Sequence, residues 1–141
     1  MIRSPNVDLW DPRWHWRVVL TNTSVTSTGR AVMGRGTALQ AATRYKHLPD
    51  LLGYLLRAHN PEDIFVFASE RIITFPTKRD WKDPAQIDLI RTCTNKLAQF
   101  ANRHSSELIA LPPPGIGNGH LLLSDVLPII TSLPDNVHLL K

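Results

Sequence analysis

The sequence contains a single cysteine, Cys93, among 141 residues. One thiol cannot form an internal disulfide, so we expect a protein of the reducing cytoplasm. No apolar run approaches the roughly 20 residues that a membrane helix needs, and residues 1–16 lack the apolar segment of a secretory signal. We therefore expect a cytoplasmic protein with no membrane partner. The histidines show no ligand-type spacing, so no metal site is predicted.

Charged residues are also few, at 20% of the chain, while hydrophobic residues reach 43%. There are no repeats and no low-complexity tracts, so we predict one globular domain over residues 1–141. The net charge is +4, which favours polyanionic partners. The basic residues are spread along the chain, and this favours a solvated basic surface over a dedicated nucleic-acid groove.

Residues 1–16 form an atypical N-terminal segment rich in tryptophan, with no regular period. Tryptophan at 10, 14 and 16 offers contact area at low entropic cost. Such a segment can cover the edge of the core or flank a ligand. We favour the packing interpretation, because most tryptophans are largely buried.

The remaining chain alternates between short apolar runs and amphipathic segments, which predicts an α/β fold with helices on both faces of a sheet. Strands are expected at 17–21, 64–68, 72–75, 108–111 and 137–140, the second and third as a hairpin or as neighbouring strands. Helices are expected at 38–45, 49–59 and 126–133, and the longest helix begins at Asp83-Pro84.

The stretch 108–120 joins a buried strand to three prolines and then to glycines at 115, 117 and 119. Alternate glycines let backbone N–H groups converge on an anion. Ser124 and Asp125 then open the next expected helix, whose N-terminus favours negative charge. The stretch predicts either a phosphate cradle or a plain tight connection.

A second glycine loop precedes the helix expected at 38–45. Gly34 and Gly36 lead into a segment of high helix propensity, so this loop offers the same anion geometry. Two such loops in one small domain favour a ligand with a pair of phosphates, such as a nucleotide-sugar diphosphate.

Two polar residues follow predicted strands. Asn22 stands where ligands bind in open α/β sheets, and its amide suits sugar hydroxyls, although it could merely shape an Asx-turn. Lys78 follows the run at 72–75 and, taken alone, would be a surface residue.

Three motifs in order resemble the macrodomain family: Val32 to Gln40, Phe75 to Trp81 and Leu111 to Gly119. They are most similar to the subgroup of ADP-ribosyl glycohydrolases that includes the antitoxin removing ADP-ribose from thymidine in DNA. The similarity runs from about Arg17 to Lys141. It implies a three-layer α/β/α sandwich with a mixed sheet that binds ADP-ribose at the carboxyl edge.

The resemblance also implies roles for particular residues. Asn22 would face the distal ribose, the first loop would approach that ribose and the diphosphate, and the second loop would hold the diphosphate. The implied ligand-binding set is Asn22, Gly34, Arg35, Gly36, Thr37, Gly115, Ile116, Gly117, Asn118 and Gly119. Lys78 matches the lysine that the subgroup uses for catalysis. No metal and no cofactor are implied.

A neutral Lys78 amine could attack an opened ribose to form a Schiff base or could polarise the anomeric centre. Its pKa would have to be lowered, by neighbouring Arg79 or by partial burial. His120 stands where the branch acting on DNA has glycine. It could be a general acid or base, a ring packed over the loop or a partner of a sugar.

The family's usual N-terminal strand, with its acidic residue near the adenine, is not recognisable in this sequence. No adenine contact can therefore be named from the motifs, although Trp14 or Trp16 could stack on the base. We expect a monomer that hydrolyses ADP-ribose from a modified acceptor, DNA base or protein side chain. The alternatives are a reader module without chemistry, and removal of phosphate from phosphorylated ADP-ribose with His120 as acid or base.

Overall fold

Six strands and four α-helices follow one another along the chain, and the computed structural model describes all residues 1–141. In chain order they are β1 (Ile2–Arg3), β2 (Trp16–Asn22), α1 (Gly36–Arg44), α2 (Leu48–Ala58), β3 (Phe65–Phe67), β4 (Ile72–Lys78), α3 (Ile87–Arg103), β5 (Ile109–Leu111), a single 3₁₀ turn η1 (Gly117–Gly119), α4 (Leu123–Ile130) and β6 (Val137–Leu139).

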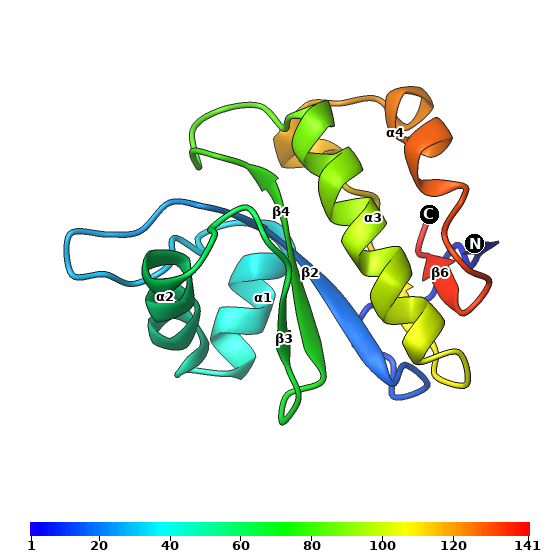
Figure 1. The fold of residues 1–141 in the computed structure, drawn as a ribbon, viewed down its shortest axis with the longest axis horizontal. Helices are drawn as coiled ribbons and strands as arrows, with labels where there is room; N and C mark the ends of the chain where they lie inside the picture. Colours follow the sequence, from blue (N-terminus) through cyan, green and yellow to red (C-terminus); the bar gives the residue numbers. More distant parts are fainter.

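The strands form one sheet in the order β1-β6-β5-β2-β4-β3. Every neighbouring pair is parallel except β3 and β4, which form the antiparallel hairpin that the sequence allowed. Helices α1 and α2 cover one face of the sheet, and α3 and α4 cover the other (Figure 1). The expected three-layer α/β/α sandwich with a mixed sheet is confirmed.

The central pair, β2 and β4, runs further than the sequence indicated, because β4 continues through Pro76 to Lys78. Proline cannot donate to a sheet ladder, and a shift in pairing accommodates it. Thr21 pairs with Pro76, and Asn22 then pairs with Lys78, so that Thr77 is skipped. This irregularity brings Asn22 and Lys78 together at the carboxyl edge.

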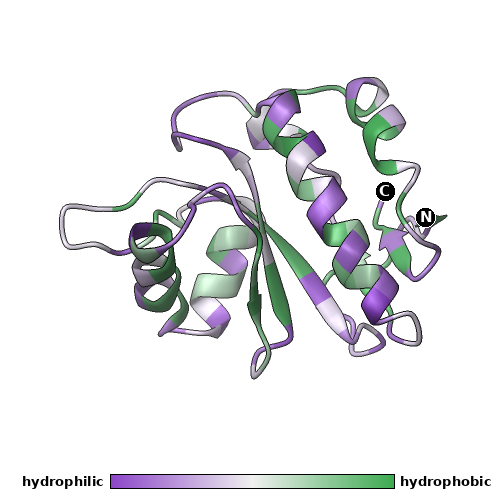
Figure 2. Cartoon of the chain, viewed as in Figure 1, coloured by the Kyte–Doolittle hydropathy of each residue, from purple (hydrophilic) through white to green (hydrophobic).

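Each face of the sheet has its own hydrophobic core. The larger core lies under α3 and α4, and the smaller one under α1 and α2. Purple and green alternate along α3 in Figure 2, as expected of an amphipathic helix with one buried side. None of the four α-helices combines the length and the apolar composition that crossing a bilayer requires.

The N-terminal segment packs as we favoured. Trp14 and Trp16 are both 4% exposed, and the Trp16 ring stands edge-on to Phe100 with centroids 5.0 Å apart. Trp16 opens β2 one residue before the expected strand. Residues Ile2–Arg3 form edge strand β1, which was not recognised because two exposed residues carry no periodicity.

The start of α3 differs from expectation. The helix begins at Ile87 rather than at Asp83, because two hydrogen bonds to carbonyls outside the helix hold the preceding residues. The Ala85 N–H donates to the Gly119 carbonyl over 2.9 Å, and the Gln86 N–H donates to the Thr77 carbonyl over 2.9 Å. The segment therefore links the end of β4 to the second glycine loop.

The last helix also begins earlier than expected. Helix α4 starts at Leu123, with Leu122 rather than Ser124 in the N-cap position. The Asp125 carboxylate accepts the Leu122 N–H at 3.1 Å, so Asp125 stabilises the first turn from inside the helix.

Candidate functional site

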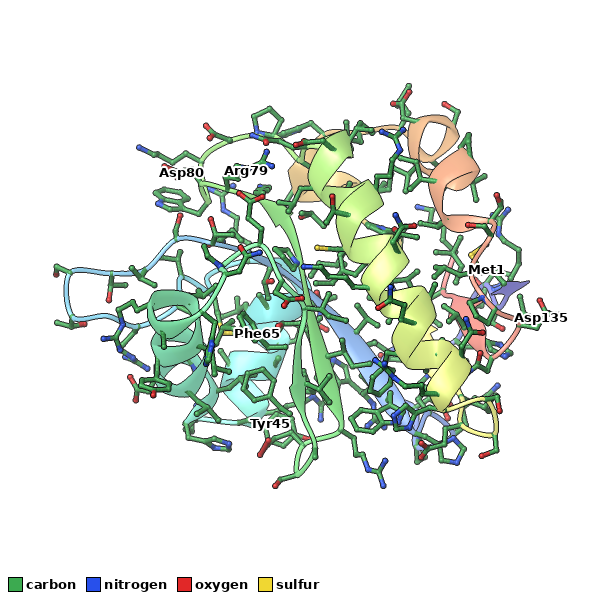
Figure 3. All side chains as sticks on the ribbon, in the orientation of Figure 1. Met1, Tyr45, Phe65, Arg79, Asp80 and Asp135 are labelled. Atoms are coloured by element: carbon green, nitrogen blue, oxygen red, sulfur yellow. The ribbon has the colours of Figure 1, made fainter.

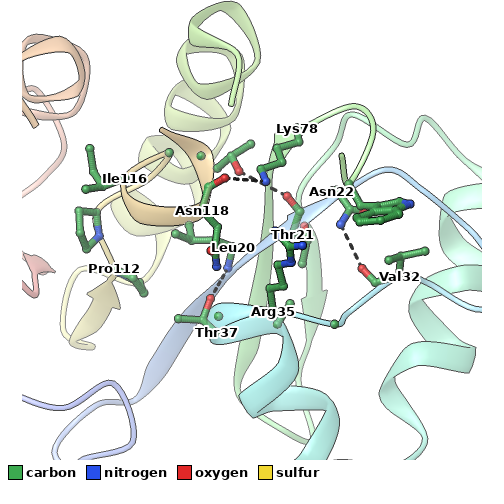
Figure 4. A pocket seen from close by; sticks show the side chains of 18 residues that line it. Leu20, Thr21, Asn22, Val32, Arg35, Thr37, Lys78, Pro112, Ile116 and Asn118 are labelled. Atoms are coloured by element: carbon green, nitrogen blue, oxygen red, sulfur yellow. Dashed lines mark hydrogen bonds between the residues drawn. The ribbon is translucent and has the colours of Figure 1, made fainter. Parts of the chain in front are cut away.

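A cavity of about 430 Å³ opens where β2, β4 and β5 end (Figure 4). Its volume suits a small-molecule ligand, and its place matches the ligand-binding edge of open α/β sheets. The residues that line it are Leu20, Thr21, Asn22, Val32, Gly34, Arg35, Gly36, Thr37, Ala38, Thr77, Lys78, Trp81, Pro112, Pro113, Gly115, Ile116, Asn118 and Gly119.

The first glycine loop ends in the N-terminus of α1 on the cavity wall. Gly36, Thr37 and Ala38 form the first turn of this helix, and all three line the cavity. No side chain caps the helix, so its leading N–H donors remain available. A helix N-terminus with free amides attracts an anion. The Thr37 hydroxyl accepts the Leu20 N–H at 3.0 Å and ties this turn to β2.

The second glycine loop closes the cavity from the side of β5. Gly115 has φ +80°, and a Cβ on it would lie 2.8 Å from Leu121 Cδ1 and 2.9 Å from Ile90 Cδ1. Glycine is therefore required there both by the backbone and by packing. The two loops meet, because a Cβ on Gly36 would lie 3.4 Å from Asn118 Nδ2.

Of the two helix N-termini that the sequence predicted at the site, the one after the second loop does not reach the cavity. The first-turn residues of α4 do not line the cavity, whereas those of α1 do. The second loop itself ends in the 3₁₀ turn at Gly117–Gly119, and this turn separates the cavity from the N-terminus of α4.

Lys78 ends β4, and its Nζ donates to the Asn118 carbonyl over 2.9 Å (Figure 4). Partial burial lowers the pKa of the Lys78 amine below its ordinary value, and the Arg35 guanidinium lowers it further, while the Asp83 carboxylate acts in the opposite direction. Burial was one of the two expected causes. The other, Arg79, does not contribute; Arg35 from the first loop takes that place.

Arg79 instead holds the loop after β4. Its Nε donates to Glu62 over 2.8 Å, its Nη2 donates to Asp88 over 2.8 Å, and its Nη1 donates to Gln86. Hydrogen bonds to the two carboxylates raise the pKa of Arg79 and neutralise its charge locally. Figure 3 shows Arg79 and Asp80 on the connection that follows β4. The result is an anchored loop beside Lys78.

Asn22 shapes the loop and also lines the cavity. Its Oδ1 accepts the Ser24 N–H at 2.9 Å, which is the Asx-turn considered from the sequence. Its Nδ2 donates to the Val32 carbonyl over 3.1 Å and joins the two ends of the loop (Figure 4). One amide hydrogen and one oxygen lone pair remain available to a ligand.

The structure brings most of the predicted site residues to one cavity. These are Lys78, Asn22, Gly34, Arg35, Gly36, Thr37, Gly115, Ile116, Asn118 and Gly119. Gly117 and His120 are not among the lining residues, and His120 is exposed. His120 has φ +64°, a conformation in which glycine is at ease.

The suggestion that Trp14 or Trp16 stacks on adenine is wrong. Both are buried near the amino end of β2, whereas the cavity lies at its carboxyl end. The tryptophan on the cavity wall is Trp81, which is 41% exposed. Trp81 ends the second of the three motifs, but its position in the sequence indicates no role, because only the path of the loop after β4 brings it to the cavity.

The cavity walls hold no metal-binding cluster: nowhere in the chain do three or more histidine, cysteine, aspartate or glutamate side chains gather for an ion. The polar groups at the site are amides, hydroxyls, the Lys78 amine and the Arg35 guanidinium. Such a donor set suits a sugar diphosphate.

Comparisons with known proteins agree with this geometry. No protein-family model matches the chain. A DNA ADP-ribosyl glycohydrolase of Mycobacterium tuberculosis is 31% identical in an alignment of 106 residues that covers 67% of this chain and 29% of that protein. A DNA ADP-ribosyl glycohydrolase of Mycobacterium bovis matches to the same extent. The chain thus spans less than a third of the length of these curated relatives.

Solved structures give the same result over nearly the whole chain. The macrodomain of Mycobacterium tuberculosis DarG has a TM-score of 0.78 at 28% identity and covers 99% of this chain and 95% of its own. The macrodomain of Thermus aquaticus DarG has a TM-score of 0.78 at 25% identity, covering 100% and 98%. Thermosipho africanus DarTG, solved in complex with ADP-ribose, shares the fold with a TM-score of 0.72 at 19% identity, covering 94% and 39%.

The sheet order, the two glycine loops and the cavity between them define a macrodomain, and the chain belongs to that family. Within the family it stands close to the DarG subgroup.

Proposed function

We propose that this macrodomain binds ADP-ribose in the cavity at the carboxyl edge and releases it from a modified acceptor. The observation that carries the proposal is that the free amides of α1 and the Lys78 amine line one cavity. Two relatives are DNA ADP-ribosyl glycohydrolases, and one solved neighbour holds ADP-ribose, which supports this ligand.

The position of each group suggests how the ligand lies. The diphosphate fits between the first turn of α1 and the second glycine loop, where backbone N–H groups are concentrated. The distal ribose then lies beside Asn22 and Lys78, which pair across β2 and β4. The Arg35 guanidinium adds positive charge at the same end.

Lys78 supplies the chemistry in this proposal. Its neutral amine attacks C1 of the distal ribose, the bond from C1 to the acceptor breaks, and the acceptor takes the electron pair together with the proton shed by the attacking nitrogen. Water then adds to C1 and releases the lysine nitrogen, which returns free ADP-ribose and the amine. The lowered pKa of Lys78 favours the neutral form that this step requires.

The acceptor that we propose is a base of ADP-ribosylated DNA, in line with the relatives, which are DNA ADP-ribosyl glycohydrolases. The positive net charge of +4 favours a polyanionic substrate. The cavity uses amides and side chains of one chain alone, so a monomer is sufficient.

A direct assay tests the hydrolase. ADP-ribosylated oligonucleotide is incubated with the wild-type protein, with Lys78→Ala and with Lys82→Ala, and released ADP-ribose is measured. Lys82 is an exposed lysine on the same loop that does not line the cavity, so it is the matched control. We expect release by the wild type and by Lys82→Ala, and loss with Lys78→Ala. Release that survives Lys78→Ala would remove the amine from the mechanism.

A reader module without chemistry is the second candidate. The hydrogen bond from Lys78 Nζ to the Asn118 carbonyl favours it, because this bond could serve only to hold the second loop in place. Calorimetry with free ADP-ribose separates the cases. Binding without release from any ADP-ribosylated DNA or protein substrate identifies a reader. Phosphate removal, which relied on His120, is not proposed because that residue does not line the cavity.

A further inference from the structure

Trp81 is a large aromatic side chain held at the mouth of the cavity. It is 41% exposed although it lines the site. Its backbone N–H donates to Ser24 Oγ over 3.1 Å, which fixes the turn to the loop after β2. The Arg35 guanidinium carbon lies 5.9 Å from the ring centroid, within the range of a cation–π contact. The ring is therefore positioned while its surface remains accessible to solvent.

The loop that carries Trp81 is fixed at several further points. Arg79 binds Glu62 and Asp88, and the Asp83 N–H donates to the Asp80 carbonyl over 3.1 Å. A loop anchored in this way holds its side chains with little freedom. An exposed tryptophan on a mobile loop would need no explanation, but an exposed tryptophan on an anchored one does.

The sheet order places Trp81 at one end of the cavity. Trp81 continues from β4, whereas Pro112 and Pro113 continue from β5, and β2 lies between these strands. Two strand spacings separate the two ends by about 10 Å. Lys78 ends β4, so its backbone shares the Trp81 end, and its Nζ reaches from there to the Asn118 carbonyl.

The group attached to C1 of the distal ribose must lie at the end that holds the attacking amine. With the distal ribose beside Asn22 and Lys78, as proposed above, that is the Trp81 end, and the nucleoside half of the ligand would extend toward Pro112 and Pro113. A flat aromatic face at that end of the cavity offers stacking to an aromatic acceptor and little to an aliphatic one.

We propose that Trp81 contacts the acceptor and selects a nucleobase by stacking on it, an inference that rests on the proposed function. Arg35 supports the ring from its own side of the cavity and supplies positive charge for the adjoining phosphates. The competing role for Trp81 is stacking on the adenine of ADP-ribose itself, and the two roles predict different losses.

The test compares two ligands in the Lys78→Ala background, where no turnover occurs. The affinity for an ADP-ribosylated oligonucleotide and for free ADP-ribose is measured by calorimetry, with the unmodified oligonucleotide as a blank. The additional substitutions are Trp81→Leu, Trp81→Phe and Trp10→Leu. Trp10 is the matched control, a half-buried tryptophan outside the cavity that also lies against an arginine.

We expect Trp81→Leu to weaken binding of the modified oligonucleotide by about 5- to 150-fold, the usual contribution of one stacked base, and to leave the affinity for free ADP-ribose within twofold. Trp81→Phe restores most of the loss, and Trp10→Leu has no effect. Equal weakening of both ligands would assign Trp81 to adenine and overturn the proposal. So would unchanged binding of the oligonucleotide, or a loss that Phe does not restore.

The proposed function fails by a different signal. If the protein with Trp81 intact binds no ADP-ribose, both proposals fall. If it binds ADP-ribose but the parent protein with Lys78 releases none, only the hydrolase falls, and the selective loss in Trp81→Leu still supports acceptor stacking.

Discussion

Three glycines of the two loops have different surroundings, so the same substitution to alanine at each of them makes a matched experiment. Gly115→Ala, Gly117→Ala and Gly34→Ala each add one methyl group. At Gly115, φ is +80° and the new Cβ would meet three side-chain atoms at 2.8–3.1 Å. At Gly117, φ is +73° and no atom lies within 4 Å. At Gly34, φ is not positive and the space is open.

The magnitudes follow from these contacts. A left-handed backbone costs an L-residue about 1–2 kcal/mol, which is all that Gly117→Ala should lose. Gly115→Ala adds an overpacking cost of about 1–3 kcal/mol, for a total loss of roughly 2–5 kcal/mol in the free energy of unfolding. Gly34→Ala should stay within about 0.5 kcal/mol of the wild type. Because Gly34 lines the cavity, we expect the added methyl group to weaken ADP-ribose binding instead.

Urea unfolding with a common m-value measures the stability of all three variants, and calorimetry with ADP-ribose measures binding. Equal losses of stability for Gly115→Ala and Gly117→Ala would refute the packing argument. A loss above about 1 kcal/mol for Gly34→Ala would refute the claim that the methyl group meets open space.

Three further outcomes are expected. If the neutral Lys78 amine is the nucleophile, release of ADP-ribose rises with pH through the lowered pKa of Lys78, and a pH–rate profile measures this rise. Arg35→Gln raises the Lys78 pKa and shifts the rise to higher pH, whereas Asp83→Asn lowers the Lys78 pKa and shifts the rise to lower pH. Leu97→Ala, in the larger core, lowers the free energy of unfolding by about 2–5 kcal/mol in urea titrations and leaves the ADP-ribose affinity of the folded protein unchanged. Burial raises the pKa of the Cys93 thiol to about 12, so a thiol reagent labels it only after the protein is unfolded, and rapid labelling of the native protein would contradict this.

Local patterns in the chain predict much of this protein. Apolar runs mark the strands, and glycine and proline mark the turns, because these features depend on neighbours in sequence. The order of strands and helices, the α/β/α layers and both glycine loops follow from them. The same reasoning misses β1, whose two exposed residues carry no pattern, and it starts α3 at Asp83, since it cannot include the hydrogen bonds of Ala85 and Gln86 to distant carbonyls.

Tertiary structure alone decides which groups meet at the site. The sheet order sets β2 between β4 and β5, and this brings the Lys78 amine to the carbonyl of Asn118, which lies 40 residues later in the sequence. It selects Arg35 rather than the adjacent Arg79 as the charge that lowers the Lys78 pKa, because carboxylates already hold Arg79. It also turns Trp81 toward the cavity. The amino-acid sequence by itself determines the elements and the chemical groups at their ends, whereas the distances between those groups depend on how strands far apart in the chain pair and how the loops between them are anchored.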